Sequence, residues 1–306
     1  MVEEIKQTFR GQIKGSFKSI FAGIVVSKGD NELVVRGNYP LDLESYNVKI
    51  GISESSEISL EKGLTMVKNS NHIRVGDIIS VNGNSIRSLF RPYSPHNSIF
   101  ATVRCNSNCL MCSQPPLDYD DTKEYYYMWK YAISLMPDDV RFIGITGGEP
   151  MLMGDYLVGL INDLTDKFPK IKIDILSNGR TQSKSITKEL LAKVKSPSSV
   201  IFAIPLYSDF YQEHDHIVQA KDAFYQTILG IHNLASLGFK IEIRIVLHLL
   251  SLKRLDKLAD FIHLNFPFVY HITFMGLEIV GHTNANKEIL LIDDNKWLNE
   301  QLVRSI

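Results

Sequence analysis

All three cysteines of this 306-residue chain lie in one short segment, at Cys105, Cys109 and Cys112. Thiolates at this CxxxCxxC spacing can each hold one iron of a [4Fe–4S] cluster, and the fourth iron then stays open to a substrate or cofactor. An odd number of cysteines in one loop does not form a disulfide framework. Two alternatives are a tetrahedral zinc site completed by a fourth ligand such as His96 and thiols that bind nothing.

Two further polar segments follow apolar, strand-like runs. Gly147, Gly148 and Glu149 come after the run 140–145, and Ser177-Asn178-Gly179 comes after the run 171–176. Two adjacent glycines let the backbone approach a ligand without a side chain in the way. The alternatives are structural, since Glu149 can be a favourable charge at a helix start and Ser-Asn-Gly is a common turn.

One charged side chain lies inside an apolar run. Arg244 falls within the run 241–247, where alternation places it opposite its apolar neighbours. An arginine inside a sheet is rarely buried without an anion. That anion is either part of a ligand or a carboxylate of the chain such as Glu242 or Glu278.

The cysteine segment after one strand-like run and Gly147-Gly148-Glu149-Pro150 after the next together resemble the radical S-adenosylmethionine (SAM) superfamily. The resemblance implies two cofactors, a [4Fe–4S] cluster on the three cysteines and SAM, whose methionine amino and carboxylate groups chelate the open iron. It also implies the chemistry, in which a reduced cluster passes one electron to SAM. The resulting 5′-deoxyadenosyl radical removes a hydrogen atom from the substrate.

The same resemblance implies roles in SAM binding. Glu149 accepts a hydrogen bond from the methionine ammonium group, Ser177 and Asn178 face the ribose or methionine end, and Arg244 binds the SAM carboxylate as a bidentate fork. Three apolar residues are candidates to pack on adenine, with a core position as the alternative; they are Met111, Met275 and Leu277. No residue is assigned to catalysis itself.

The stretch 202–216 is similar to one that usually carries Ser-Leu-Asp and then His-Asp in peptide-modifying members. Pro205 and Tyr207 stand here in place of the Ser and the Asp, so we assign no SAM contact to this strand. We interpret His214 and His216 as helix-start and packing residues rather than catalysts.

The elements that must position these residues are predicted by periodicity. Strand-like runs alternate with segments of helical spacing such as 156–168 and 228–237, and successive strands start 29 to 41 residues apart; the runs are 99–103, 140–145, 171–176, 200–206, 241–247 and 271–274. This spacing is typical of βα units with a parallel sheet. Six units leave an incomplete barrel or an open doubly wound sheet, and the resemblance implies the former, a partial (β/α)6 TIM-type barrel.

The N-terminal part has a different pattern. Short β-branched runs at 23–27, 32–36, 73–81 and 85–90 alternate with turn signals such as Asn82-Gly83-Asn84, which predicts strands joined by tight loops. We therefore expect a small β domain over residues 1–95, a radical SAM core over 96–285 and a C-terminal helical extension over 286–306. The β domain would recognise a precursor peptide or simply cap the barrel.

Composition excludes several classes of protein. There are 33 Lys+Arg and 34 Asp+Glu, a net charge of −1, which argues against a basic nucleic-acid surface. No apolar run approaches the ~20 residues that span a bilayer, and the start lacks a hydrophobic signal-type stretch. We expect a soluble, cytoplasmic protein with neither nucleic-acid nor membrane partners.

The resemblance narrows to the His-Xaa-Ser system radical SAM maturases at three stretches, 75–79, 109–116 and 274–278. It implies a precursor peptide substrate, a second radical SAM partner protein and an external electron donor such as flavodoxin or ferredoxin. Because no cysteine follows Cys112, auxiliary clusters cannot form from this chain, and net oxidation would need an external acceptor. Alternatives are a small-molecule or nucleobase substrate, a radical-activating enzyme, and a zinc-stabilised binding scaffold without redox activity.

Overall fold

The computed structural model describes residues 8–10, 13–14, 21–29, 32–39, 46–51, 64–65, 73–82 and 85–292. The chain divides into two compact units, residues 1–99 with 126–142 and residues 100–125 with 143–306. Within the described ranges no helix has both the length and the apolar character that crossing a membrane requires.

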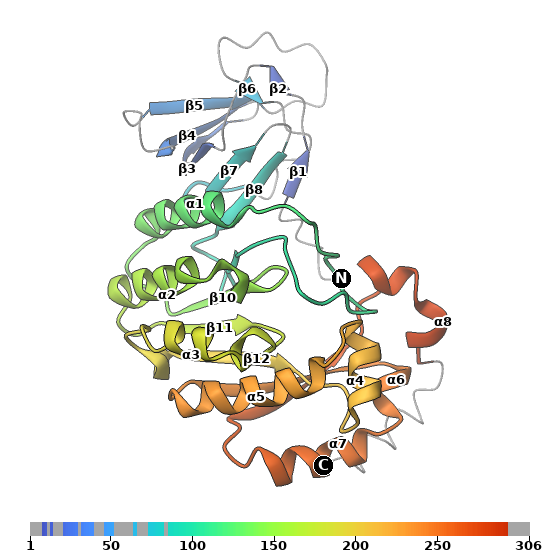
Figure 1. Ribbon diagram of the computed structural model, residues 1–306. Helices are drawn as coiled ribbons and strands as arrows, with labels where there is room; N and C mark the ends of the chain where they lie inside the picture. The colour runs from blue at the N-terminus through green and yellow to red at the C-terminus, as the bar shows by residue number, and fades with distance from the viewer. Residues whose placement is uncertain are drawn as a thin grey trace. The chain divides into compact units, whose positions relative to one another are not determined.

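Six strands form one sheet in the order β14-β13-β12-β11-β10-β9, so the order in space follows the order in the chain (Figure 1). Their bounds are β9 Ser98–Phe100, β10 Phe142–Thr146, β11 Lys172–Leu176, β12 Val200–Pro205, β13 Lys240–Leu247 and β14 His271–Gly276. The pairs from β11 to β14 are parallel. The six predicted strands and the partial-barrel fold class are confirmed.

The first predicted strand, 99–103, is shorter than expected, because the chain leaves the ladder after Phe100. The buried Asp121 carboxylate accepts from Val103 N at 2.9 Å and from Thr102 Oγ1 at 2.5 Å. These bonds add to the backbone bond from Ala101 N to Thr146 O and hold the segment that leads into the cysteine loop, residues 104–113.

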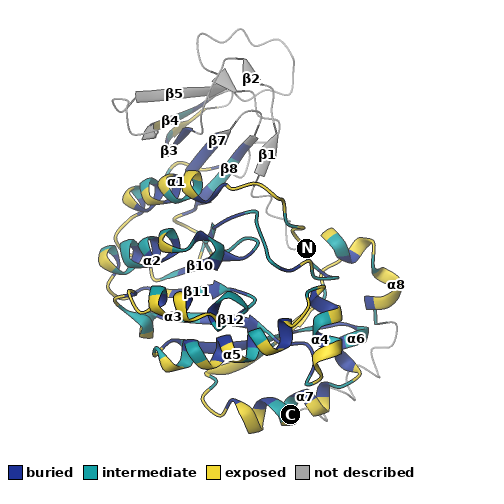
Figure 2. Cartoon of the chain, viewed as in Figure 1, coloured by how far each residue is buried: buried dark blue, intermediate teal, exposed yellow. Residues whose placement is uncertain are grey.

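Helices follow the strands in the expected alternation. Their bounds are α1 Thr122–Leu135, α2 Asp155–Lys167, α3 Ser185–Leu191, α4 Tyr211–Val218, α5 Ala223–Ser236, α6 Leu249–Leu252, α7 Leu255–Asn265 and α8 Lys287–Leu290, with short 3₁₀ turns η1 Pro150–Met153, η2 Thr181–Ser183, η3 Pro197–Ser199 and η4 Gly281–Asn284. In α2, Leu157, Leu160, Ile161 and Leu164 are fully buried at helical spacing, as expected for a helix with one face on a sheet. Figure 2 shows α2 and α5 with an exposed outer side.

The two faces of the parallel sheet differ in chemistry. On β11, Ile173 and Ile175 are completely buried, whereas Asp174 and Leu176 are partly accessible. Since successive side chains of a strand point to opposite faces, one face is apolar and the other presents polar groups. The partly accessible face includes Leu176 and Arg244, which both line the pocket described below.

The N-terminal residues form an antiparallel sheet in the order β1-β8-β7-β3-β4-β5, with β2 and β6 as a separate pair. The bounds are β1 Thr8–Arg10, β2 Ile13–Lys14, β3 Phe21–Lys28, β4 Glu32–Tyr39, β5 Tyr46–Gly51, β6 Leu64–Thr65, β7 Ile78–Asn82 and β8 Ser85–Phe90. The strand predicted at 73–81 begins only at Ile78, because Gly76 (φ 94°) lies in a turn closed by Asp77 N donating to Arg74 O.

The predicted domain boundaries stay a prediction. The compact unit that contains the antiparallel sheet also includes residues 126–142. Of the helical extension predicted over 286–306, α8 covers Lys287–Leu290, and residues 293–306 lie outside the described residues.

Candidate functional site

A pocket of about 270 Å³ opens at the carboxyl ends of the parallel strands. It brings together residues from the cysteine loop and from the ends of β10 to β14. The lining consists of Cys105, Ser107, Cys109, Met111, Cys112, Ser113, Thr146, Gly147, Gly148, Leu176, Ser177, Asn178, Ala203, Pro205, Tyr207, Arg244, Val246 and Met275. Ten of the twelve predicted site residues are in this set, and Glu149 and Leu277 are not.

The three cysteines are unpaired, partly buried thiols that share this pocket. Burial raises the pKa of Cys105 to about 11 and that of Cys109 to about 12, and it also raises the pKa of Cys112. Neighbouring negative charges add to the effect at Cys105 and Cys109. A bound cationic centre reverses this preference, since thiolates are the form that ligates metal.

The donor set fits a cluster better than a single ion. Among the described residues, no three His, Cys, Asp or Glu side chains are grouped so that they could hold one metal ion, which a zinc site requires. In a [4Fe–4S] cluster each cysteine holds a different iron, so the sulfurs need not converge on one point. His96, the fourth ligand of the zinc alternative, packs edge to face on Phe142 with ring centroids 6.3 Å apart.

Gly147 and Gly148 allow the end of β10 to lie against the backbone that leads into the cysteine loop. Gly148 N donates to Thr102 O and Glu149 N donates to Arg104 O, both at 2.7 Å. A Cβ on Gly148 would lie 2.0 Å from Arg104 O, and one on Gly147, whose φ is 144°, would lie 2.6 Å from Thr102 O. These glycines therefore allow two segments of the backbone to approach each other closely. They also line the pocket.

The Glu149 side chain is completely buried and is satisfied by the protein. Its carboxylate accepts from Met151 N at 3.0 Å, Ser177 Oγ at 2.7 Å and Asn178 N at 2.7 Å. Burial raises the pKa of Glu149, and these three donors partly oppose the shift. The contacts match the helix-start alternative and join β10 to the turn after β11. Glu149 as acceptor for a SAM ammonium group stays a prediction.

Asn178 reaches from the turn after β11 to the cysteine loop. Its Nδ2 donates to Asn106 Oδ1 at 2.6 Å and lies 3.9 Å from Cys105 Sγ. Ser177, only 3% exposed, donates to Glu149 and accepts from Gln182 Nε2 at 2.7 Å. Both residues line the pocket, and both also hold the protein around it.

Sequence reasoning missed three residues that fix this turn. Arg180 donates to Asn106 O and, at 3.0 Å, to Ser107 Oγ, which places a permanent positive charge beside the cysteine loop. Gly230 of α5 lets the helix touch the turn, because a Cβ there would lie 1.9 Å from Gly179 O. Gln182 is completely buried under Ser177. Arg180 directly follows the Ser-Asn-Gly turn, a signal that could have identified it.

A second missed region is the segment Gly281–Asn286, which we term the carbonyl clamp. Its groups donate to backbone oxygens of the cysteine loop: His282 N to Cys112 O at 2.9 Å, Thr283 Oγ1 to Met111 O at 3.4 Å, and Asn286 Nδ2 to Leu110 O at 2.8 Å. Gly281 (φ 57°) is packed so closely that a Cβ would lie 2.3 Å from Cys112 O. These hydrogen bonds go to backbone oxygens and therefore leave no recognisable pattern in the sequence of the cysteine loop.

Arg244 lines the pocket and is also paired within the chain. Its Nε lies 2.6 Å from Glu242 Oε1 and its Nη2 lies 3.2 Å from Glu242 Oε2. His271 Nε2 lies 3.3 Å from the same carboxylate. Burial raises the pKa of Glu242, but the bonds from Arg244 and Thr273 and the nearby charges bring the pKa below its ordinary value. Arg244 thus pairs with Glu242, the alternative partner within the chain. Its binding of a SAM carboxylate stays a prediction.

The three apolar candidates are placed differently. Met111 is 9% exposed and Met275 is 37% exposed, and both line the pocket. Leu277 instead packs against the side-chain cluster that includes Met111 and Tyr207. Leu277 is partly buried in that contact, and packing on adenine stays a prediction for all three residues.

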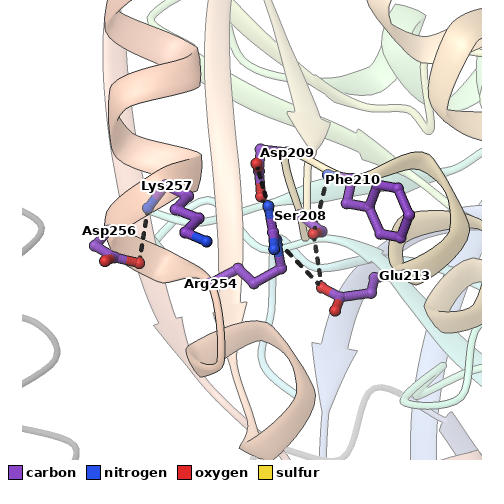
Figure 3. A network of polar contacts seen from close by, with 7 residues as sticks. All are labelled: Ser208, Asp209, Phe210, Glu213, Arg254, Asp256 and Lys257. Carbon is purple, nitrogen blue, oxygen red and sulfur yellow. Dashed lines mark hydrogen bonds and ion pairs between the residues drawn. The ribbon is translucent and has the colours of Figure 1, made fainter.

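The loop after β12 is held away from the pocket except at Tyr207. Arg254 donates to both carboxylate oxygens of Asp209, at 2.7 and 2.6 Å, and Ser208 Oγ donates to Glu213 at 2.9 Å (Figure 3). His214 is 1% exposed, which confirms its interpretation as a packing residue. Tyr207 lines the pocket.

Comparison with known proteins adds relatives of two kinds. GTP 3′,8-cyclases of Campylobacter jejuni (strain RM1221) and Aliarcobacter butzleri (strain RM4018) are 26% and 25% identical over 152 residues, 48% of this chain and 45% of each relative. The match thus spans less than half the length of these relatives. Streptococcus suis SuiB bound to S-adenosylmethionine has a similar fold, with a TM-score of 0.53, 20% identity, and coverage of 69% of this chain and 46% of SuiB.

A second SuiB structure, bound to precursor peptide SuiA, has a TM-score of 0.52 and 19% identity, with the same coverage. At this identity the likeness concerns the fold. The family model of the radical SAM superfamily matches residues 99–262, a range that spans the cysteine loop and five of the six parallel strands. Because this match covers more than half of the chain, the chain belongs to the radical SAM superfamily of enzymes, which use a [4Fe–4S] cluster and SAM.

Proposed function

We propose that this radical SAM enzyme modifies a ribosomally made precursor peptide, in the manner of the His-Xaa-Ser system maturases that stretches 75–79, 109–116 and 274–278 resemble. The observation that carries the choice of a peptide is the edge of β14 beside the pocket, with which no strand of the described ranges pairs. SuiB, which shares the fold, has been solved with its precursor peptide SuiA.

Cys105, Cys109 and Cys112 would hold the cluster, and SAM would lie against Gly147, Gly148, Asn178 and Arg244 in the same pocket. When bound, the two cofactors supply a radical that removes a hydrogen atom from the substrate. The chain's own part is to hold the thiolates in one loop, orient SAM and shield the pocket. Asn178 and Arg180 hold that loop from one side through Asn106.

The edge strand favours an extended substrate. β14 is the last strand of the sheet, and among the described residues no strand pairs with its free side. Ile272 and Phe274 are 43% and 37% exposed, and Met275 of the same strand lines the pocket. A free edge offers a row of backbone donors and acceptors to which an extended peptide can add as a further strand. A peptide paired along β14 would run to the pocket.

A small-molecule substrate is the second candidate, because the curated relatives are GTP 3′,8-cyclases. The two functions share every step up to SAM cleavage and differ in the molecule that loses the hydrogen atom. A second radical SAM protein belongs to the peptide proposal, whereas an electron donor such as flavodoxin or ferredoxin is needed for SAM cleavage in both. All three cysteines of the chain lie in one loop, so these 306 residues supply no cysteines for an auxiliary cluster that would accept electrons.

The test is an anaerobic reaction of the reconstituted enzyme with SAM, a reductant and the precursor peptide encoded beside its gene. We expect a changed peptide mass together with 5′-deoxyadenosine. Release of 5′-deoxyadenosine with an unchanged peptide would contradict the peptide proposal and favour a small molecule. Replacement of any one of the three cysteines by Ala should abolish SAM cleavage, and a protein that binds one zinc and stays colourless would remove the cluster site.

A further inference from the structure

Tyr207 occupies a distinctive place in the pocket wall. It follows β12 directly and lines the pocket together with Cys109 and Cys112. Its side chain packs in a cluster with Met111, and Cys109 lies against that cluster. Only 5% of Tyr207 is exposed. A phenol therefore stands in a wall next to two of the three thiols.

Two imidazole rings hold Tyr207 in this position. Its ring centroid lies 5.9 Å from that of His214, with the planes 29° apart, and 5.8 Å from that of His248, with the planes 40° apart. His214 Nδ1 accepts from Tyr207 N at 3.4 Å, and His248 Nδ1 accepts from Ser251 N at 3.2 Å. Burial lowers the pKa of His214 to about 3 and that of His248 to about 4. Both rings are thus neutral and fixed to the backbone.

The Tyr207 hydroxyl forms no hydrogen bond within the described part of the chain. It is not fully enclosed by protein either, so it is accessible to solvent. The ring packs against the two histidines, and the small exposed part of the residue includes the hydroxyl. The surface that this hydroxyl can reach is the pocket that the residue lines. Burial raises the pKa of Tyr207, so its phenol is protonated at neutral pH and can donate.

Two side-chain donors that line the pocket already have partners. Asn178 Nδ2 is directed to Asn106 and Cys105, and Arg244 is occupied by Glu242. Cys109 packs against the cluster that contains Tyr207, and Cys112 lines the same pocket. An anionic sulfur in this wall is an acceptor for the proton of the hydroxyl.

We infer that Tyr207 donates a hydrogen bond to the thiolate of Cys109 in the cluster-loaded enzyme and thereby raises the reduction potential of the cluster. The inference rests on the cluster site of the proposed function. Hydrogen bonds to ligand sulfurs tune cluster potentials, because they stabilise the more negative, reduced state. Tyr207 is in this role a tuning residue, and removal of its hydroxyl makes the cluster harder to reduce.

The test compares Tyr207→Phe with wild type and with Tyr225→Phe, a matched control because Tyr225 is 58% exposed on α5 and does not line the pocket. Iron content and the visible spectrum are measured first, and the midpoint potential is then determined by redox titration followed by electron paramagnetic resonance without SAM. We expect equal iron content in all three proteins and a more negative potential in Tyr207→Phe alone. In addition, an exchangeable-proton coupling to the reduced cluster should disappear in that variant.

Equal potentials in the three iron-loaded proteins would overturn the inference and leave the proposed function intact. A difference that emerges only after SAM is added would place the hydroxyl on SAM and would also overturn it. Loss of iron from Tyr207→Phe alone would show a structural role instead. Failure of wild type to take up iron would refute the cluster site itself, and the inference with it.

Discussion

Two regions far apart in the sequence hold the cysteine loop, and they do so by different means. The ends of β10 and β11 use a completely buried carboxylate, Glu149, and glycines without room for a Cβ. The carbonyl clamp after β14 uses donors that reach backbone oxygens, and Asn286 within it is only partly buried. Buried charge and close packing tolerate fewer changes than partly solvated hydrogen bonds do. The first region should therefore be the more sensitive.

The largest effect is expected for Gly148→Ala. The new Cβ would lie 2.0 Å from Arg104 O, so the backbone before Cys105 must move, at about 3 kcal/mol of unfolding free energy. Thermal unfolding measures the loss of stability, and iron content after reconstitution measures the displacement of the cysteine loop. Gly276→Ala is the control, because a Cβ there meets nothing within 4 Å. Equal stability of the two variants would show that the contact is not restrictive.

A smaller loss is expected for Glu149→Gln on the same side of the loop. In the wild type, Ser177, Asn178 and Met151 donate hydrogen bonds to the Glu149 carboxylate. The amide has the same shape, but its NH₂ group cannot accept from these donors. Hydrogen bonds to charged groups contribute about 2 kcal/mol. Chemical denaturation measures the change, with Glu189→Gln on the exposed side of α3 as control. A wild-type midpoint would mean that the charge is not needed there.

On the clamp side, Asn286→Ala removes the bonds from Nδ2 to Leu110 O and His282 O. We expect a loss of about 1 kcal/mol and faster release of iron to a chelator. Asn265→Ala is a matched control, because its Nδ2 bonds a helix carbonyl, Phe261 O, on the exposed surface of α7. If Asn286→Ala destabilised the protein more than Glu149→Gln does, the ranking of the two regions would be reversed.

The smallest effect concerns the ion pair behind the pocket, Asp209 with Arg254. The bonds from Arg254 hold the pKa of Asp209 below its ordinary value of 3.8. A carboxylate with a lowered pKa stabilises the fold above that ordinary value, and the contribution is lost as the pH falls through the lowered pKa. Asp209→Asn should therefore lower stability by about 0.5 kcal/mol at neutral pH and by less in acid.

Chemical denaturation across pH 2 to 7 checks this prediction, and Asp256→Asn on α7 is the control, because the Asp256 carboxylate bonds only the adjacent Lys257 N in Figure 3. A stability difference between Asp209→Asn and wild type that persists unchanged in acid would show that the ion pair is not its cause.

Much of the site was predictable because the residues that carry its chemistry are close together in the sequence. Cys105, Cys109 and Cys112 are close in the chain, and the segments after β10 and β11 directly follow apolar runs, so the βα pattern alone brings them to one edge of the sheet. The roles of individual side chains were less predictable. Glu149 is bound by Ser177, which is distant in the sequence, and Arg244 pairs with Glu242 two residues before it on β13, a partner that the sequence offered beside a ligand without deciding between them.

The sequence by itself determined the alternation of strands and helices, the cysteine loop and the family to which both belong, since each depends on residues near one another in the chain. Only the tertiary structure decided that Gly281 to Asn286 donates to carbonyls of the cysteine loop and that two histidine rings pack against Tyr207. Backbone oxygens are the same in every residue, and ring stacking depends on how separate loops fold together. Such contacts therefore leave no pattern in the local sequence from which they could be predicted.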